Sequence, residues 1–243
     1  MSLKKIRTIF AKIKNTFLTP HYINFHKNVE KNLEKKGIKK TNKLINFLFK
    51  FLWFLPNLES SKYWSNRQAD DGHGYKKYLE IDSNSRILIN EIKIRANKND
   101  KILDLCCNIG RHLNALTEMG YSNLFGVDIN NLAIEKMKTT FKNINTKNIF
   151  HENAESYLLK TGSNFFDVVY TYGATVELIP PTFPLVNEIC RVSKKFVIFL
   201  IEEDGHAYPR FWRYEFKRNN MNLIYSKNFF GPSLLVYEKT HNR

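Results

Sequence analysis

Short apolar runs alternate with amphipathic segments between about residue 101 and residue 201. The runs have the length of strands, whereas apolar residues in the intervening segments recur at steps of three and four, which predicts helices. The predicted strands cover 101–105, 124–127, 149–151, 166–172 and 196–201, and the predicted helices cover 111–119, 131–141, 154–160 and 183–192. This alternation is typical of an α/β fold in which helices cover both faces of a parallel sheet.

The end of the chain follows another pattern. A predicted helix over 208–218 is followed by two apolar runs, 223–229 and 234–238, with Gly231 and Pro232 between them. Two strands that a tight turn joins form an antiparallel hairpin. We therefore expect the parallel sheet to be extended by a C-terminal hairpin.

The first 60 residues differ from the rest. Apolar residues spaced by three or four, with basic residues between them, predict a basic amphipathic helix; they are Leu3, Ile6, Ile9, Phe10, Ile13 and Phe17. A second stretch, 44–55, is apolar on nearly all sides but shorter than the ~18–20 residues that span a bilayer. The chain thus divides into a basic, aromatic helical extension (residues 1–60) and a larger domain (residues 61–243).

The distribution of charged residues supports this division. Residues 1–60 hold 13 of the 38 lysines and arginines but 3 of the 23 acidic residues, so +10 of the net charge of +15 lies there. Two interpretations are open: residues 1–55 lie on an anionic membrane surface, or they form a helical cap on the domain or on the second subunit of a homodimer. Three cysteines are too few for a disulfide framework. We expect a cytoplasmic protein, peripheral on the cytoplasmic face of a membrane under the first interpretation.

The most informative stretch runs from the strand at 102–105 into a turn of small residues. In α/β folds ligands bind beyond the carboxyl ends of the strands, where Gly110 would let the backbone approach a ligand closely. The next strand ends at Asp128, which is placed to accept hydrogen bonds from a ribose diol.

This stretch resembles the class I S-adenosylmethionine-dependent methyltransferases, in which an acid is followed by a glycine-rich turn. Asp104 is that acid and Gly110 the last glycine, while Cys106 and Asn108 replace the first two glycines. A Cys-Asn-x-Gly-Arg turn is familiar in a bacterial subgroup often linked to surface polysaccharide pathways. The resemblance covers roughly residues 60–240 and implies a Rossmann-like, seven-stranded, mostly parallel sheet with S-adenosylmethionine as the cofactor.

The resemblance also implies a cofactor site. In it Asp128 holds the ribose hydroxyls, Ile129 flanks the adenine, and Asn153-Ala154 contacts the adenine amine. A Trp-x-x-Arg helix would close over the cofactor, so that Arg67 pairs with its carboxylate. The full predicted set is Arg67, Asp104, Cys106, Asn108, Gly110, Arg111, Asp128, Ile129, Asn153, Ala154 and Tyr170.

Methyl transfer to a weakly acidic hydroxyl requires an aligned acceptor and a base. Relatives that act on small molecules often carry Glu-His where this chain has Glu177-Leu178, so the base is expected elsewhere. Our candidates are His206, with Glu203 beside it, and His73 in a Gly72–Gly74 segment that resembles a lid. The simpler alternatives are a helix N-terminus at 202–206 and, around His73, a surface loop followed by a packing helix. Predicted substrate-binding residues are Tyr172, Glu177 and Tyr208.

Other chemistries are disfavoured. Methyltransferases of adenine and exocyclic nitrogens carry Asn/Asp-Pro-Pro-aromatic after the fourth strand, whereas this chain has Tyr170-Thr171-Tyr172-Gly173 there. Cys106, Cys107 and His112 lack a second ligand pair, so no metal is expected. We predict an O-methyltransferase of a small-molecule or glycan acceptor, a sugar or glycolipid of a surface polysaccharide pathway. The alternatives are an RNA-directed methyltransferase and a non-catalytic relative that binds a partner.

Overall fold

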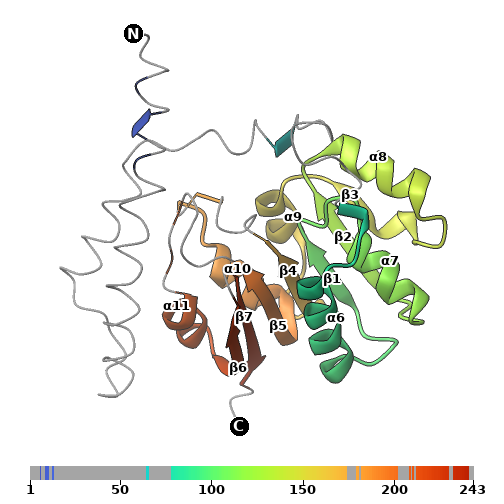
Figure 1. The fold of residues 1–243 in the computed structure, drawn as a ribbon. Helices are drawn as coiled ribbons and strands as arrows, with labels where there is room; N and C mark the ends of the chain where they lie inside the picture. The colour runs from blue at the N-terminus through green and yellow to red at the C-terminus, as the bar shows by residue number, and fades with distance from the viewer. Residues whose placement is uncertain are drawn as a thin grey trace.

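The computed structural model describes most of the larger domain (Figure 1). It describes residues 78–173, 179–180, 182–201, 212–229 and 232–240, and the single residues Ile6, Ile9, Phe10, Ile13, Trp64, Ser65, Tyr208 and Arg210. Most of the predicted extension lies outside the described residues, as do the predicted site residues Arg67, His73, Glu177, Glu203 and His206.

One sheet organises the described chain. Its strands are β1 (Ile102–Leu105), β2 (Leu124–Asp128), β3 (Ile149–His151), β4 (Phe166–Tyr172), β5 (Ser193–Ile201), β6 (Met221–Asn228) and β7 (Ser233–Lys239). The helices are α6 (Ser83–Arg95), α7 (Arg111–Glu118), α8 (Asn131–Thr140), the short η2 (Thr146–Asn148), α9 (Ala154–Lys160), α10 (Leu185–Val192) and α11 (Trp212–Arg218). None of the helices in the described ranges is long and apolar enough to cross a membrane.

The strand order β3-β2-β1-β4-β5-β7-β6 confirms the predicted fold class. The first five strands are parallel, and β7 runs antiparallel to both β5 and β6. The order reverses between β1 and β4, and the loops that follow these two strands leave the same edge of the sheet. In open α/β sheets such a switch point is where ligands bind.

The observed bounds of the elements agree most closely with the predicted ones where an apolar segment is short and has polar residues at both ends. The predicted limits of β3, β4 and α9 are those observed. The prediction for α11 was wrong at its start, since the helix begins at Trp212 rather than at 208. Strand β5 begins at Ser193, three residues before its predicted start, because polar residues that pair with the neighbouring strand carry no apolar signal.

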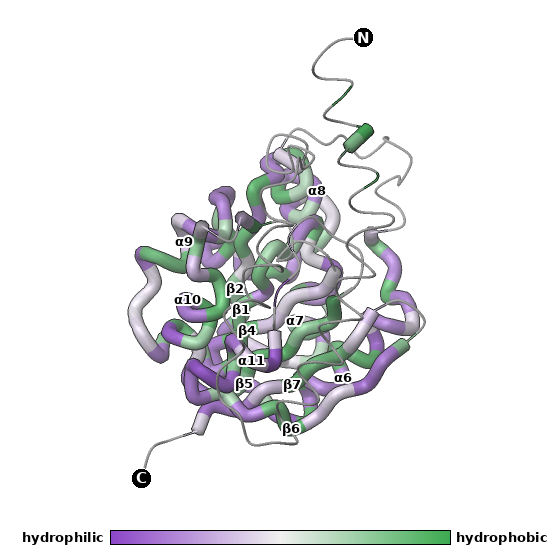
Figure 2. Tube along the Cα trace, turned by 90° about the vertical axis from the view of Figure 1, so that its left-hand side faces the viewer, coloured by the Kyte–Doolittle hydropathy of each residue, from purple (hydrophilic) through white to green (hydrophobic). Residues whose placement is uncertain are grey.

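Helices cover both faces of the sheet and bury a core on each. On one face α9, α10 and α11 pack against the strands through residues such as Leu158, Ile189 and Phe216. On the other face α6, α7 and α8 do so through residues such as Leu88 and Leu116. Hydrophobic residues accordingly concentrate along the central strands (Figure 2). This burial holds the strand ends in place.

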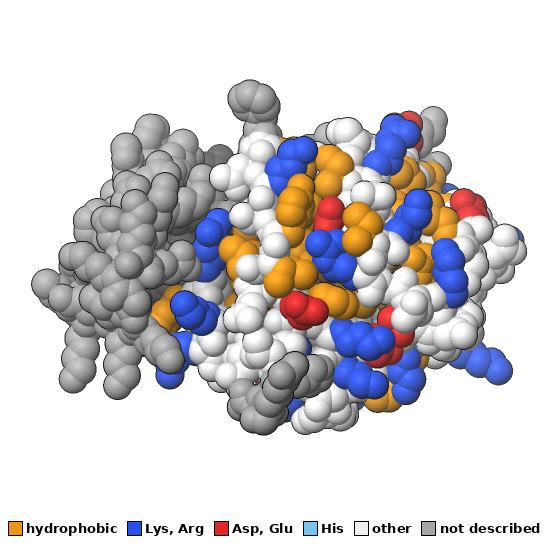
Figure 3. Space-filling view, turned by 90° about the horizontal axis from the view of Figure 1, so that it is seen from below, with side chains coloured by type: hydrophobic (Ala, Val, Ile, Leu, Met, Phe, Trp, Pro, Cys, Tyr) orange, Lys and Arg blue, Asp and Glu red, His pale blue; other side chains and the backbone are white. Residues whose placement is uncertain are grey.

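Lysine and arginine side chains are scattered among hydrophobic ones on the face shown in Figure 3. At the amino ends of the strands these charges are paired. Lys195 Nζ lies 2.9 Å from Asp100 Oδ1 and 3.1 Å from Asp167 Oδ1, and Lys194 Nζ lies 3.9 Å from the same oxygen of Asp167. We assign these ion pairs to the scaffold, because they join neighbouring elements at the edge opposite the switch point.

Candidate functional site

The turn after β1 is shaped by left-handed backbone. Cys106, Asn108 and Gly110 have φ angles of 66°, 50° and 73°. Asparagine adopts this conformation more readily than most residues, which explains how Asn108 replaces a glycine of the usual motif. Its Oδ1 also accepts a hydrogen bond from the Ile109 N–H at 2.7 Å. Cys106 is the less favoured replacement, since its side chain offers the backbone no such local bond.

Gly110 is required for two reasons. Its φ is in the left-handed region, and a Cβ atom there would lie 2.7–2.8 Å from the side chain of Met137 on α8. Gly110 also precedes α7 as its N-cap residue. The turn therefore packs closely against α8 while directing the start of α7 toward the switch point.

Asp128 is oriented by the backbone on both sides. Its Oδ2 accepts the Asn108 N–H at 2.8 Å, and its Oδ1 accepts the Asn130 N–H at 2.8 Å. Burial raises the pKa of Asp128, while these backbone hydrogen bonds oppose the rise. A carboxylate has about four acceptor positions, so these backbone bonds leave acceptor capacity for a ligand diol. The position predicted from the sequence therefore suits a ribose.

Asp104 is a buried carboxyl at the same edge. Its exposed fraction is 2%, and burial raises its pKa from 3.8 to about 7, with the Tyr170 hydroxyl opposing the rise and Asp128 adding to it. The Tyr170 hydroxyl faces this carboxyl, but neither Asp104 Oδ2 nor the hydroxyl makes a hydrogen bond of normal geometry. Tyr170 itself is wholly buried in the core beside α6. A buried carboxyl with an unpaired oxygen is costly to ionise and favours a cationic ligand nearby.

The thiols of Cys106 and Cys107 lie near the same acids. Burial raises the pKa of Cys106 well above its ordinary value, and Asp128, Asp104 and Glu155 raise it further. The pKa of Cys107 is raised by burial and by the first two of these acids. Both thiols are therefore protonated at neutral pH, and the turn lies in a negative potential.

The ends of β2 and β3 lie side by side. Asp128 pairs with His151 in the sheet, and the His151 ring lies 3.1 Å from the carbonyl oxygen of Ile129 through Nε2. Asn153 caps α9 by accepting the Ser156 N–H at 2.7 Å, and Ala154 is buried behind it. The residues predicted to border the adenine thus lie at neighbouring strand ends.

A segment far upstream reaches this edge. Trp64 and Ser65 are helical, and the carbonyl oxygen of Trp64 accepts a hydrogen bond from Asn130 Nδ2 at 3.0 Å. Asn130 also caps α8 by accepting the Ala133 N–H at 3.1 Å. The start of the predicted Trp-x-x-Arg helix therefore lies against the end of β2.

Arg111 faces α6. Its Nη1 donates to the Glu80 carbonyl at 2.9 Å, its Nη2 lies 3.4 Å from Asp82 Oδ2, and its guanidinium lies 4.8 Å from the centre of the Tyr172 ring. The Tyr172 hydroxyl donates to Asp82 Oδ2 at 2.9 Å. The sequence analysis did not identify Asp82, because its one local signal is that of a helix cap. Asp82 does cap α6, since its Oδ1 accepts the Ser85 N–H at 2.6 Å.

His112 serves the scaffold. It is 6% exposed, its Nε2 lies 2.9 Å from Ser85 Oγ, and its ring centre lies 5.1 Å from that of Tyr172. Burial lowers its pKa to about 3, with Arg111 adding to the effect. The imidazole is therefore neutral at pH 7 and holds α6 against α7.

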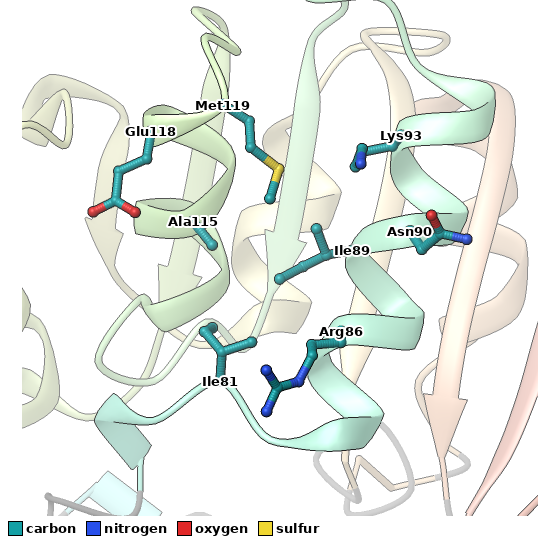
Figure 4. Close-up of a pocket in the computed structure, with 8 residues that line it drawn as sticks. All are labelled: Ile81, Arg86, Ile89, Asn90, Lys93, Ala115, Glu118 and Met119. Carbon is teal, nitrogen blue, oxygen red and sulfur yellow. The ribbon is translucent and has the colours of Figure 1, made fainter.

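Two further features complete the description. Tyr208 is half-buried. A groove of about 380 Å³ runs between α6 and α7 (Figure 4) and is lined by Ile81, Arg86, Ile89, Asn90, Lys93, Ala115, Glu118 and Met119. None of the predicted site residues lines it, so we do not assign the groove to the candidate site. Within the described residues, no group of three or more His, Cys, Asp or Glu side chains could hold a metal ion.

Residues 102–195 match the family model of the methyltransferase domain. No curated protein is significantly similar to the chain in sequence.

Solved structures with the same fold include three methyltransferases. A TehB-like SAM-dependent methyltransferase from Corynebacterium glutamicum has a TM-score of 0.52 and 17% identity over 63% of this chain and 87% of that one. Magnesium protoporphyrin IX methyltransferase from Synechocystis, solved with bound SAM, has a TM-score of 0.54 and 11% identity over 72% and 86%. An S-adenosylmethionine-dependent methyltransferase from Mesorhizobium loti has a TM-score of 0.52 and 12% identity over 66% and 100%. At these identities the likeness is one of fold.

Proposed function

We propose that this S-adenosylmethionine-dependent methyltransferase acts on an oxygen atom of a small-molecule or glycan acceptor, a sugar or glycolipid of a surface polysaccharide pathway. The observation that carries the proposal is a convergence at one edge of the sheet. The turn around Gly110, the oriented carboxylate of Asp128 and the half-exposed Tyr172 all lie at the carboxyl ends of neighbouring strands. Cofactor and acceptor would meet there.

The charges of this edge suit S-adenosylmethionine. The cofactor carries a sulfonium and an ammonium, and Asp104, Asp128 and Glu155 give the turn a negative potential. In the proposal Asp128 holds the ribose diol, while Ile129 and Asn153-Ala154 border the adenine. Arg67 pairs with the cofactor carboxylate. When bound, the cofactor supplies an electrophilic methyl group.

An oxygen acceptor needs its proton removed. His112 is unsuited to this task, because it is buried and neutral with a pKa of about 3. We therefore keep His206, assisted by Glu203, as the proposed base and His73 as the second candidate. Tyr172, Glu177 and Tyr208 are the proposed acceptor contacts.

Membrane association through residues 1–55 belongs to the same proposal. Ile9, Phe10 and Ile13 are helical and 46%, 57% and 44% exposed, respectively. A helical cap on the chain's own domain would bury such a face, whereas an amphipathic helix on an anionic surface inserts it among lipids. The charge of +10 in residues 1–60 favours the second arrangement. A glycolipid acceptor would be presented at that surface.

Methyl transfer from radiolabelled S-adenosylmethionine tests the proposal. The acceptors are nucleotide sugars, glycolipids and RNA, with Asp128→Ala as the variant that should lose incorporation. Label in the sugar or glycolipid fractions, sensitive to that substitution, supports the proposal. Label in RNA would overturn the acceptor class, and the absence of saturable cofactor binding in calorimetry would favour a non-catalytic partner-binding protein.

A further inference from the structure

A buried arginine joins the two loops that follow β4 and β5. Arg210 Nη2 lies 3.2 Å from the carbonyl oxygen of Ile179 and 3.3 Å from that of Pro180, and it donates to both. Its side chain is 3% exposed. Because β4 and β5 are parallel, both loops leave the sheet at the edge where the turn after β1 lies.

The guanidinium is anchored to the sheet through an aromatic pair. It lies 6.0 Å from the centre of the Trp212 ring, which packs edge-to-face against Phe199 of β5 at 5.7 Å. Trp212 is 3% exposed and belongs to the core beneath α10 and α11. The Trp212–Phe199 pair thus packs the guanidinium against the sheet, while its Nη2 donates to the carbonyl oxygens of Ile179 and Pro180.

Burial of this guanidinium carries a high desolvation cost. Glu215 Oε2 lies 3.7 Å from Arg210 Nη1, beyond hydrogen-bond length, and Arg210 Nε has no hydrogen-bond partner. Burial lowers the pKa of Arg210, and Glu215 opposes the fall. An apolar side chain would join the loops at a lower desolvation cost. The guanidinium adds directional hydrogen bonds to two consecutive carbonyls, which fix the backbone position rather than the packing alone.

The backbone that Arg210 holds leads directly into α10. The Phe183 N–H donates to the Pro180 carbonyl at 3.0 Å, and the Glu188 N–H donates to that of Pro184 at 3.0 Å. A shift of Pro180 would therefore be transmitted to the first turn of α10.

We infer that Arg210 is a positioning residue of the proposed transfer reaction, which holds the backbone of Ile179 and Pro180 ahead of α10 so that an acceptor is aligned at the strand ends. The inference rests on the proposed function. Arg210 acts through the backbone of Ile179 and Pro180, and does not itself touch the acceptor. A displacement of about 1 Å in such a loop can cost about 100-fold in rate.

Kinetics of the full chain provide the first test. Arg210→Met should lower kcat/KM for the sugar or glycolipid acceptor by about 10- to 100-fold, chiefly through kcat, while S-adenosylmethionine affinity stays within about twofold. Arg210→Lys, which retains a donor and the charge, should recover part of the loss. Arg213→Met, three residues further along the chain in α11, is the matched control and should leave both constants unchanged. Equal loss of cofactor affinity in Arg210→Met would show a general structural role and overturn the inference.

Hydrogen exchange provides a test that needs no acceptor. In Arg210→Met the amides of Phe183 and Glu188 should exchange faster than in the parent, and in Arg213→Met they should not. If the parent methylates no acceptor, the proposed function fails while the exchange experiment still decides whether Arg210 holds this loop. Unchanged exchange at both amides would overturn the inference.

Discussion

The hydroxyl of Tyr172 donates to Oδ2 of Asp82 at 2.9 Å, although the two residues are 90 positions apart. This hydrogen bond joins the carboxyl end of β4 to the N-cap of α6, and Arg111 adds a guanidinium 3.4 Å from the same oxygen. The pKa of Asp82 is lowered, because its hydrogen bonds and Arg111 outweigh the effect of burial. The helix that precedes β1 is thereby attached to the edge where the acceptor is proposed to bind.

Tyr172→Phe should destabilise this attachment. Loss of one partly exposed hydrogen bond to a carboxylate should lower the free energy of unfolding by about 0.5–1.5 kcal/mol. Urea unfolding of the full chain measures the change. Tyr225→Phe on the edge strand β6, where the side chain is 38% exposed, is the control and should have little effect. Equal effects of the two substitutions would contradict the assigned role of the hydroxyl.

Asp128→Ala should weaken the cofactor complex. A charge-assisted contact to two hydroxyls is worth about 2–3 kcal/mol, so S-adenosylmethionine affinity should fall about 30- to 150-fold in calorimetry. The side chain also accepts the N–H groups of Asn108 and Asn130, so Ala leaves two donors without a partner. Asp128→Asn keeps the side-chain shape and one acceptor oxygen. It therefore removes the charge while it retains part of the hydrogen bonding that orders the turn. A folded Ala variant with parental affinity would refute the site.

Asp104 should make stability fall as pH rises. Its pKa is about 7 in the folded protein against an ordinary value of 3.8, so the folded state binds more protons than the unfolded state between these values. The stabilisation is complete below 3.8 and is lost as pH rises through 7. From pH 5.5 to 8.5 this group should lower the free energy of unfolding by about 2 kcal/mol.

Asp104→Asn should remove that part of the pH dependence. The variant cannot ionise, so its urea midpoint should change less than the parental midpoint between pH 5.5 and 8.5. Saturating S-adenosylmethionine should also reduce the parental dependence if its cationic groups lie near this carboxyl. Parallel pH profiles in parent and variant would show that Asp104 does not titrate in this range.

His206→Ala tests the proposed base. A sugar hydroxyl is too weak an acid to react efficiently while protonated, so the turnover rate should fall by about 10²- to 10⁴-fold with little change in cofactor affinity. The parental rate should rise with pH near 6.5, where an ordinary histidine loses its proton. His73→Ala is the companion variant. Parental turnover in His206→Ala would move the role to His73 or indicate an acceptor, such as a carboxylate, that needs no base.

The full-length chain should bind anionic vesicles. The exposed face of Ile9, Phe10 and Ile13 would insert, and the surrounding basic residues would add a salt-sensitive attraction. Phe10→Ser or deletion of residues 1–18 should reduce sedimentation with phosphatidylglycerol-containing vesicles and leave cofactor affinity intact. If the full-length chain does not bind such vesicles at low salt, the helical-cap interpretation is favoured.

The sequence alone determined the alternation of strands and helices and predicted the place of a cofactor turn. Short apolar runs with polar ends marked β3 and β4 to the residue, because the period of a strand and the preferences of turn residues are local properties. The acid–turn–glycine pattern located Asp104, Gly110 and Asp128 for the same reason. Left-handed backbone at Asn108 was compatible with that pattern, since asparagine tolerates it.

Only the tertiary structure decided which side chains meet across the fold. In the sequence, Asp82 has the pattern of a helix cap and Arg210 has no local signal of its role. Their partners Tyr172 and Ile179 are 90 and 31 positions away along the chain. The sequence also left the state of Asp104 open, because the pKa of a carboxyl depends on how completely the surrounding strands and helices exclude water. Contacts and dielectric surroundings of this kind arise when the elements pack together, and no local pattern encodes them.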